Sequence, residues 1–275
     1  MAGLGALLSK VDLRDYNLNK LKTSTQYPDS YEINMKHMIK NQQNISSCTA
    51  HALSSILEYH DGNIKELSTN FIYGLKNKLF LHTGKGETIR DALSIAKDYG
   101  DPIKELCPGN NDVDEVYEIA NKAFEDESIL KDAYLHKIDS YVKLKDDNDI
   151  KYALMNFGPV IACIKWYTKY KFNMKTKFAI FDDNPIFKTY HAIVIFGWDK
   201  DGWWCQNSWG FGWGYFGLFK VKFEDVVEAY GIIDDKELSS KFKDTNKIII
   251  PTRNNKIIDF ILKLINSIIN MCLRR

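Results

Sequence analysis

The sequence predicts an α+β fold in which a mainly helical half is followed by a strand-rich half. Through the first half, apolar residues recur every three or four positions, which is typical of amphipathic helices that bury one face. After about residue 135 the chain changes to short runs rich in Val, Ile, Phe, Tyr and Trp, separated by glycines, and such runs indicate strands. Two halves of this kind are expected to pack as two lobes, and a cleft between lobes is a favoured place for a substrate site.

Four segments of the first half carry the helical period. In residues 49–59 the positions Ala50, Leu53, Ile56 and Leu57 mark one buried stripe. The other predicted helices are TNFIYGLKNKLF (69–80), ETIRDALSIAKDYG (87–100), which ends in glycine, and VDEVYEIANKAF (113–124). The strands predicted after them are YVKL (141–144), PVIACIKW (159–166), HAIVIFGWD (191–199), GWWCQNS (202–208) and YFGLFKVKF (215–223).

Composition restricts the class of protein and its partners. The chain has 275 residues, 45% of them hydrophobic, which is enough for one large core or two modest ones. Its 37 basic and 36 acidic residues nearly cancel, so no overall field would gather nucleic acid, and we expect no nucleic-acid partner. The five cysteines are far apart and form no C-x-x-C pair, which argues against a zinc knuckle and against a disulfide framework. An intracellular reducing compartment, or enclosure in a particle, is the simpler expectation.

The chain is expected to divide into three parts. An N-terminal arm over 1–25 would serve as a short pro-segment, and a main domain over 26–230 would hold a helical lobe at about 42–134 and a strand-rich lobe at about 135–230. A C-terminal extension would cover 231–275. The start, MAGLGALLSK, lacks the basic region and the length of a secretory signal, and no segment offers 18 uninterrupted apolar residues, so we expect neither a signal nor a transmembrane span.

The C-terminal extension differs from the rest in charge and pattern. It carries nine basic and five acidic residues, and within 257–273 the polar side chains recur every three or four positions. This spacing predicts an amphipathic helix with a broad apolar face. Docking on the protein's own surface or self-association with a second copy is the simpler interpretation, and contact with a membrane surface is the alternative.

The segment NQQNISSCTAHA (41–52) places a lone thiol, Cys48, where polar turn-forming residues lead into a predicted helix. A helix N-terminus and a neighbouring imidazolium both lower the pKa of a thiol, which makes it a nucleophile. Of six histidines, only His191 begins a strand-like run and is followed sixteen residues later by Asn207, whose side chain could orient the imidazole. His51, three residues after Cys48, remains an alternative base.

These segments resemble three blocks of the papain family of cysteine peptidases, in the same order: NQQNISSCTA, YHAIVIFGWD and CQNSWGFGWGYFGLFKV. YPDSYEIN and GPVIACI support the resemblance, which covers about residues 26–224. It implies a papain-like fold with a helical left lobe, a β-barrel-like right lobe and the active-site cleft between them. The main domain would then be a cathepsin-like thiol protease.

The resemblance also implies a role for each motif residue. Cys48 would be the thiolate nucleophile and His191 the base that later protonates the leaving amine. Asn207 would orient His191, and Trp209 would shield their hydrogen bond from water. The Gln42 amide and the backbone N–H of Cys48 would form the oxyanion hole. This chemistry forms a thioester and needs no metal and no organic cofactor.

Further positions match the substrate cleft of the family. They are Gly86, with Glu87 as the alternative one position on, together with Cys163, Tyr190, Ala192 and Trp209. The walls of the main specificity pocket would be Cys163, Ala192 and either Thr88 or Ile89. Because these groups are small and neutral, we predict an apolar preference there.

Several departures from the family pattern bear on activity. Thr49 and Ile45 stand where many members have a tryptophan and a disulfide-forming cysteine, and Gln43 replaces a glycine beside Gln42. Only 47 residues precede Cys48, so self-inhibition would have to use a short arm. We expect a polypeptide-cleaving endopeptidase. The alternatives are an exopeptidase or deubiquitinase whose cleft is blocked at one end, and a papain-like protein that binds a partner without cleaving it.

Overall fold

The computed structural model describes residues 4–12, 18, 26–35, 39–62, 65–82, 84–109, 112–167, 170–181 and 186–234. The amphipathic helix predicted over 257–273 lies outside these residues, as does the last cysteine, Cys272. Among the residues in the described ranges, no helix has the length and apolar character needed to cross a membrane.

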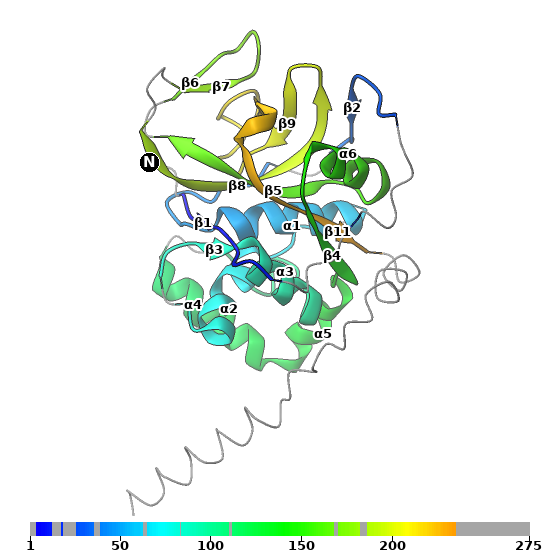
Figure 1. Cartoon of the computed structure of the whole chain (residues 1–275). Helices are drawn as coiled ribbons and strands as arrows, with labels where there is room; N and C mark the ends of the chain where they lie inside the picture. Colours follow the sequence, from blue (N-terminus) through cyan, green and yellow to red (C-terminus); the bar gives the residue numbers. More distant parts are fainter. Residues whose placement is uncertain are drawn as a thin grey trace, which may run out of the picture.

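The first half of the chain is helical, as predicted. Its helices are α1 (Cys48–His60), α2 (Thr69–Phe80), α3 (Ile89–Asp98), α4 (Val113–Glu125) and α5 (Glu127–Leu135). Figure 1 shows α2, α4 and α5 in the lower lobe and α1 between them and the sheet. The Ser68 hydroxyl caps α2 by accepting a hydrogen bond from the backbone N–H of Phe71 at 3.2 Å, which sets the start of that helix.

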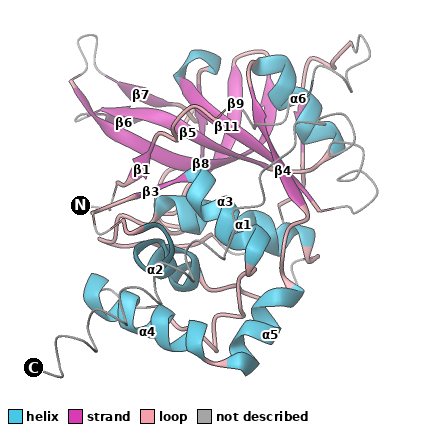
Figure 2. Ribbon diagram, turned by 60° about the horizontal axis from the view of Figure 1, so that its bottom comes forward, coloured by secondary structure: helices cyan, strands magenta, loops and turns pink. Residues whose placement is uncertain are grey.

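The second half forms a curled sheet with the strand order β10-β9-β8-β5-β11-β4, which Figure 2 shows above the helices. The strands are β4 (Ser140–Leu144), β5 (Val160–Tyr167), β8 (Phe187–Asp199), β9 (Gly202–Gln206), β10 (Leu218–Val221) and β11 (Val226–Ile233). β6 (Tyr170–Phe172) and β7 (Ala179–Phe181) form a separate hairpin, and β2 (Tyr31–Glu32) pairs with β8. β11 extends the sheet to Ile233, three residues into the segment expected as the C-terminal extension.

Two helices were not predicted. α5 follows its N-cap residue Asp126, whose Oδ1 accepts hydrogen bonds from the backbone N–H groups of Ser128 and Ile129. α6 (Asp147–Asn156) begins after Asp146, whose Oδ1 accepts from the N–H of Asp149 at 2.8 Å. In both cases an Asp cap satisfies backbone donors at the first turn and starts a helix whose apolar stripe is short.

The sheet separates two hydrophobic cores. One face of the sheet packs with α1 to α4 through residues such as Leu53, Phe71, Ile161 and Val194. The other face packs with α6 and holds Trp166, among others. Because alternate residues of a strand point to opposite faces, β5 and β8 contribute to both cores. The predicted α+β fold with two lobes is therefore confirmed.

A short N-terminal strand joins the lobes. β1 (Ala6–Leu7) runs parallel to β3 (Glu87–Thr88), which precedes α3, and its Ala6 also pairs antiparallel with Tyr190 of β8. In Figure 1, β1 and β3 lie side by side next to α1. The start of the chain thus lies between the helical lobe and the sheet.

Candidate active site

Cys48 is the first residue of α1, as its sequence context predicted. Ser47, at the N-cap position, makes no side-chain capping hydrogen bond, so the first N–H groups of the helix are not satisfied by the cap. Those groups and the helix dipole place partial positive charge beside the sulfur. From the other lobe, the backbone N–H of Ala192 on β8 points to Cys48 Sγ at 3.5 Å. The thiol therefore lies where α1 meets the strand that carries His191.

His191 is fully buried and is oriented by Asn207. Its Nε2 lies 2.7 Å from Asn207 Oδ1, and because an amide oxygen only accepts, Nε2 carries the proton. Nδ1 then carries the lone pair and has no hydrogen-bond partner among the described residues. Burial lowers the pKa of His191 to about 4, although the hydrogen bond to Asn207 opposes this. The imidazole is thus held as a neutral base with its acceptor nitrogen uncommitted.

Aromatic side chains cover the imidazole. The ring of Trp209 stacks on His191 with centroids 4.8 Å apart and an interplanar angle of 27°. The ring of Trp166 lies edge-on to the imidazole, with centroids 5.5 Å apart, and also edge-on to the ring of Trp209, with centroids 5.0 Å apart. These rings keep water away from the bond between His191 and Asn207, which strengthens it because the local dielectric is low.

Gln42 is anchored beside the cysteine loop by contacts to both lobes. Its Oε1 accepts a hydrogen bond from the Ser208 hydroxyl at 2.5 Å, and its backbone N–H donates to the Ser208 carbonyl at 2.9 Å. Its Nε2 donates to the carbonyl of Ile45 at 2.8 Å. An amide nitrogen carries two hydrogens, and this bond uses one of them. Ser208, which fixes the orientation of the amide, was not identified from the sequence.

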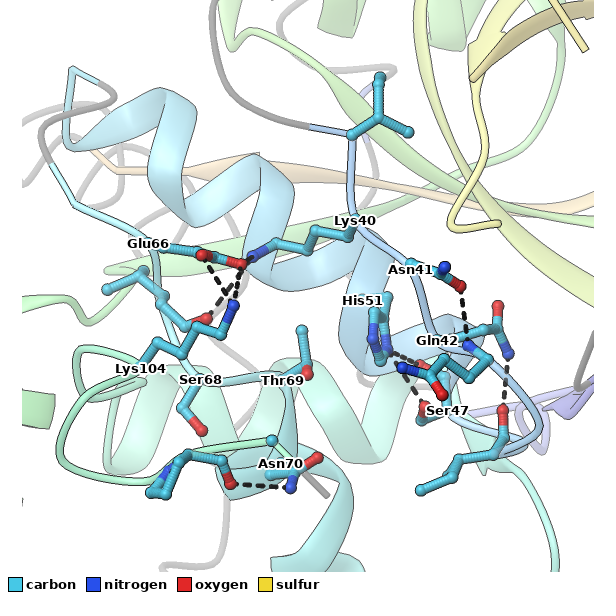
Figure 3. A pocket seen from close by; sticks show the side chains of 16 residues that line it. Lys40, Asn41, Gln42, Ser47, His51, Glu66, Ser68, Thr69, Asn70 and Lys104 are labelled. Atoms are coloured by element: carbon cyan, nitrogen blue, oxygen red, sulfur yellow. Dashed lines mark hydrogen bonds and ion pairs between the residues drawn. The ribbon is translucent and has the colours of Figure 1, made fainter. Parts of the chain in front are cut away.

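His51, the alternative base, is committed elsewhere. Its Nδ1 donates to the Ser47 carbonyl at 2.9 Å and lies 3.1 Å from the Ser47 hydroxyl, as Figure 3 shows. Burial lowers the pKa of His51 to about 3. The side chain lines a polar pocket of about 740 Å³ next to Gln42. These contacts hold His51 against the turn before α1, whereas the side-chain amide of Asn207 contacts His191.

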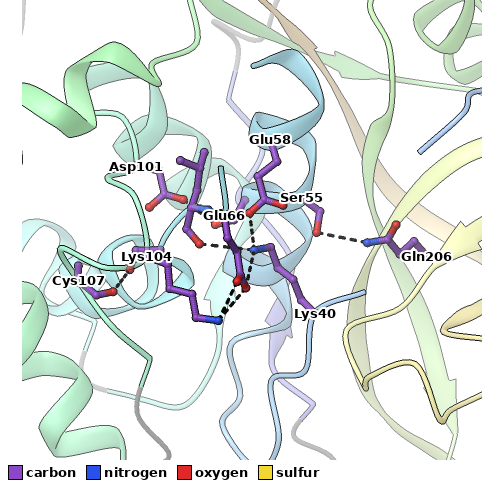
Figure 4. Close-up of polar contacts among 11 residues, drawn as sticks. Lys40, Ser55, Glu58, Glu66, Asp101, Lys104, Cys107 and Gln206 are labelled. Carbon is purple, nitrogen blue, oxygen red and sulfur yellow. Dashed lines mark hydrogen bonds and ion pairs between the residues drawn. The ribbon is translucent and has the colours of Figure 1, made fainter. Parts of the chain in front are cut away.

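A buried ion pair supports the segment that leads to Gln42. Lys40 Nζ lies 2.6 Å from Glu58 Oε1, and both side chains are at most 4% exposed. Glu66 lies 3.7 Å from the same ammonium group and also pairs with Lys104 at the rim. Figure 4 shows Lys40 placed between the two carboxylates. The ion pair attaches the segment that precedes Gln42 to the buried side of α1.

The N-terminal arm occupies the cleft. The carbonyl of Gly5 accepts a hydrogen bond from the Glu87 N–H at 2.9 Å, and a Cβ on Gly5 would lie 2.5 Å from the Cβ of Ser46, beside Cys48. Gly86 has a φ of +85°, and a Cβ there would collide with the carbonyl of Gly5. Both glycines therefore allow the arm to lie directly on the cleft wall.

The covered site keeps both reactive groups neutral. Burial raises the pKa of the Cys48 thiol, while the backbone N–H groups of Ala192, Gly5 and Thr49 oppose this to a smaller extent. Burial also lowers the pKa of His191. Neutral thiol and neutral imidazole are favoured together, because neither charge is solvated while the arm is in place.

The structure places several of the expected cleft residues on neighbouring elements. Cys163 on β5 is opposite Ala192 on β8, and Tyr190 is the residue with which the arm pairs. Thr88 caps α3 by accepting from the N–H of Asp91 at 3.0 Å. One further side chain on this wall, Glu228 of β11, was not identified, because it lies beyond the segment that the motifs cover.

A cysteine at a helix start, facing a strand that carries an Asn-oriented histidine across a two-lobe cleft, defines the papain-like class of cysteine protease. Solved structures share this fold. Xylellain, a cysteine protease from Xylella fastidiosa, superposes with a TM-score of 0.70 at 22% identity, covering 86% of this chain and 97% of that one. Procathepsin B S9 from Trypanosoma congolense does so with a TM-score of 0.62 at 15% identity, covering 84% and 86%.

The papain family cysteine protease model matches residues 25–237, so the chain belongs to the papain family of cysteine proteases. Macrodontain-1 from Ananas macrodontes is 32% identical over 101 residues, which is 34% of this chain and 42% of that protein. The aligned part thus spans less than half of this relative.

Proposed function

We propose that the protein is an endopeptidase that cleaves peptide bonds with Cys48, His191 and Asn207. The observation that supports this best is the 2.7 Å hydrogen bond from His191 to Asn207, which leaves Nδ1 of the imidazole as an uncommitted acceptor in the cleft beside the thiol. Cys48 as nucleophile, His191 as base and Asn207 as orienting group would then fill the three roles that acyl transfer to a thiol requires.

The proposed reaction proceeds through a thioester. His191 Nδ1 takes the proton of Cys48, and the thiolate attacks the carbonyl carbon of the scissile bond. The oxyanion that forms accepts hydrogen bonds from the Cys48 backbone N–H and from the Gln42 amide, after a small rotation of that side chain away from Ile45. The imidazolium then protonates the leaving amine. Water attacks the thioester with His191 as base, which releases the acid and restores the thiol.

The path of the arm favours endopeptidase action over removal of terminal residues. An extended stretch from Gly5 to Lys10 fits along the wall formed by Glu87, Tyr190 and Arg90. A cleft that holds six residues of chain on one side of the thiol also has room for the interior of a substrate. An exopeptidase would need a segment that closes this end.

We further propose that the arm is an inhibitory segment. The part of a substrate that lies along this wall would run from its N-terminal end toward Cys48 and present the scissile carbonyl to the thiol. The arm runs the other way, because Gly5 lies at the thiol and the chain continues away from it toward Ser9. It is parallel to β3 and antiparallel to β8. The arm therefore covers the thiol in the direction opposite to a substrate, which protects it from cleavage.

A reducing compartment fits the thiols. The four cysteines in the described part of the chain are Cys48, Cys107, Cys163 and Cys205. All four are buried, and none of them forms a disulfide. Cys48 remains available as a thiolate only where oxidation is slow.

The test is covalent labelling of the full-length protein by an epoxide that alkylates thiolates in peptidase clefts, followed by mass spectrometry of the adduct. A matched assay measures hydrolysis of an unstructured polypeptide, with Cys48→Ala as the control. We expect an adduct on Cys48 and internal cleavage products that the control lacks. Cleavage that persists in Cys48→Ala would refute the proposal, and products confined to one chain end would favour the exopeptidase alternative.

A further inference from the structure

A polar pocket lies beside the cysteine loop, and the proposed reaction uses only Gln42 of its wall. The pocket has a volume of about 740 Å³, which is within the range of small-molecule sites. Figure 3 shows the side chains that line it, which come from the segment before Cys48, from α1, from the start of α2 and from the rim around Lys104. Groups that are distant in the sequence thus meet around a space large enough for a ligand.

His51 presents an acceptor nitrogen to this pocket. The residue is 7% exposed, and its Nδ1 donates to the Ser47 carbonyl at 2.9 Å, so Nδ1 carries the proton and Nε2 the lone pair. Within the described part of the chain Nε2 has no hydrogen-bond partner, and because protein atoms do not enclose it, it is open to the pocket. A largely buried acceptor without a donor is unfavourable, so an occupant with a hydrogen to donate would gain free energy there.

The start of α2 supplies donors to the same pocket. Ser68 accepts from the N–H of Phe71, but the N–H groups of Thr69 and Asn70, the first two residues of this 12-residue helix, have no carbonyl one turn back to accept them. Both residues line the pocket. Because the N-terminal end of a helix carries partial positive charge, these donors favour an anion.

Two ammonium groups add positive charge to the lining. Burial is the main cause that lowers the pKa of His51 to about 3, and the charges of Lys40 and Lys104 lower it further, so the potential at the imidazole is positive. Glu66 lies 3.7 Å from Lys40 and 2.9 Å from Lys104 and offsets one of these two charges. Glu58, which also pairs with Lys40, does not line the pocket. The charged groups of the lining are therefore two cations and one anion.

We propose that this pocket binds hydrogen phosphate, an oxyanion that still carries a hydrogen at neutral pH. Its charged oxygens would accept from the first N–H groups of α2 and from Lys104, and its hydroxyl would donate to Nε2 of His51. Sulfate has the same shape and charge but no hydrogen at neutral pH, so it would place a lone pair against the lone pair of Nε2 and bind more weakly. The pocket thus distinguishes two anions that a simple positive surface would treat alike.

The experiment is isothermal titration calorimetry of the full-length protein at pH 7.5, with sodium phosphate or sodium sulfate at matched ionic strength. We expect one phosphate site in each chain and a Kd for sulfate roughly ten- to hundredfold higher, as for loss of a hydrogen bond to a charged group. Methyl phosphate, an ester that has lost its last proton at this pH, should bind as weakly as sulfate. Failure of phosphate to bind, or sulfate or the ester binding as tightly as phosphate, would overturn the proposal.

Single substitutions assign the contacts. His51→Phe removes Nε2 and should bring the Kd values of phosphate and sulfate together, whereas discrimination that persists would refute the role of His51. Lys104→Met should weaken both anions by a similar factor and keep their ratio, because its charge attracts either one. Lys122→Met, which removes an 80% exposed ammonium group on α4, is the matched control and should change neither Kd. If His51→Phe fails to fold, unchanged Kd values in Lys104→Met overturn the site as well.

Discussion

Replacing Gly5 with alanine should make the thiol of the covered chain react faster. The new Cβ would lie 2.5 Å from the Ser46 Cβ and closer still to the Ser46 carbonyl oxygen, so the arm or the cysteine loop must move. Forcing an extra methyl into a packed site typically costs about 1 to 3 kcal/mol. Only the uncovered fraction of the protein reacts, so the apparent labelling rate scales with that fraction. A cost of this size raises the rate roughly 5- to 150-fold.

The assay is the rate at which an epoxide adduct appears on Cys48 of the full-length chain, followed by intact mass. Gly109→Ala is the matched control, because a Cβ at Gly109 meets nothing within 4 Å. The pH dependence gives a second readout: uncovering the thiol removes the burial that raises its pKa, so half-maximal labelling should move to lower pH in Gly5→Ala. Equal rates in the wild type, Gly5→Ala and Gly109→Ala would refute the reasoning that the arm controls access.

Three further predictions concern groups around the site. Asn207→Ala removes the buried 2.7 Å bond to His191 and should lower kcat/KM roughly 5- to 150-fold with little change in the fold, as judged by circular dichroism; full activity would contradict the orienting role. Lys40→Met leaves the carboxylate of Glu58 buried without its 2.6 Å partner and should lower the free energy of unfolding by about 3 to 5 kcal/mol in urea melts; a loss below about 1 kcal/mol would show that the pair is not structural. Burial raises the pKa of Glu87 well above its usual 4.5, so the folded chain keeps a proton there that the unfolded chain releases above about pH 4.5. The free energy of unfolding should therefore fall as pH rises, by up to about 1.4 kcal/mol per pH unit, and Glu87→Gln should flatten that decline between pH 5 and 8; parallel curves would contradict it.

The sequence by itself was enough for the features that depend on local chemistry. Residues 69–80 form the helix that their apolar spacing predicted, with the bounds that the Ser68 cap gives it. Cys48 at a helix start, and His191 on a strand sixteen residues before Asn207, were identified because their residue types and spacings match the motifs of the papain family. The helix that follows Asp146 was missed, although its Asp cap is visible in the sequence, because its apolar stripe is short.

Tertiary structure alone decided which distant groups meet. Nothing in the sequence spacing of Gly5 and Glu228 indicates that both lie in one cleft. Gly5 directly precedes the two-residue strand β1, and Glu228 lies after the last motif segment. Their positions depend on how β11, β5 and β8 align and on how the arm enters between the lobes. The pKa values of Cys48 and His191 are likewise set by burial between the lobes, because desolvation depends on everything packed around a group and not on its neighbours in sequence.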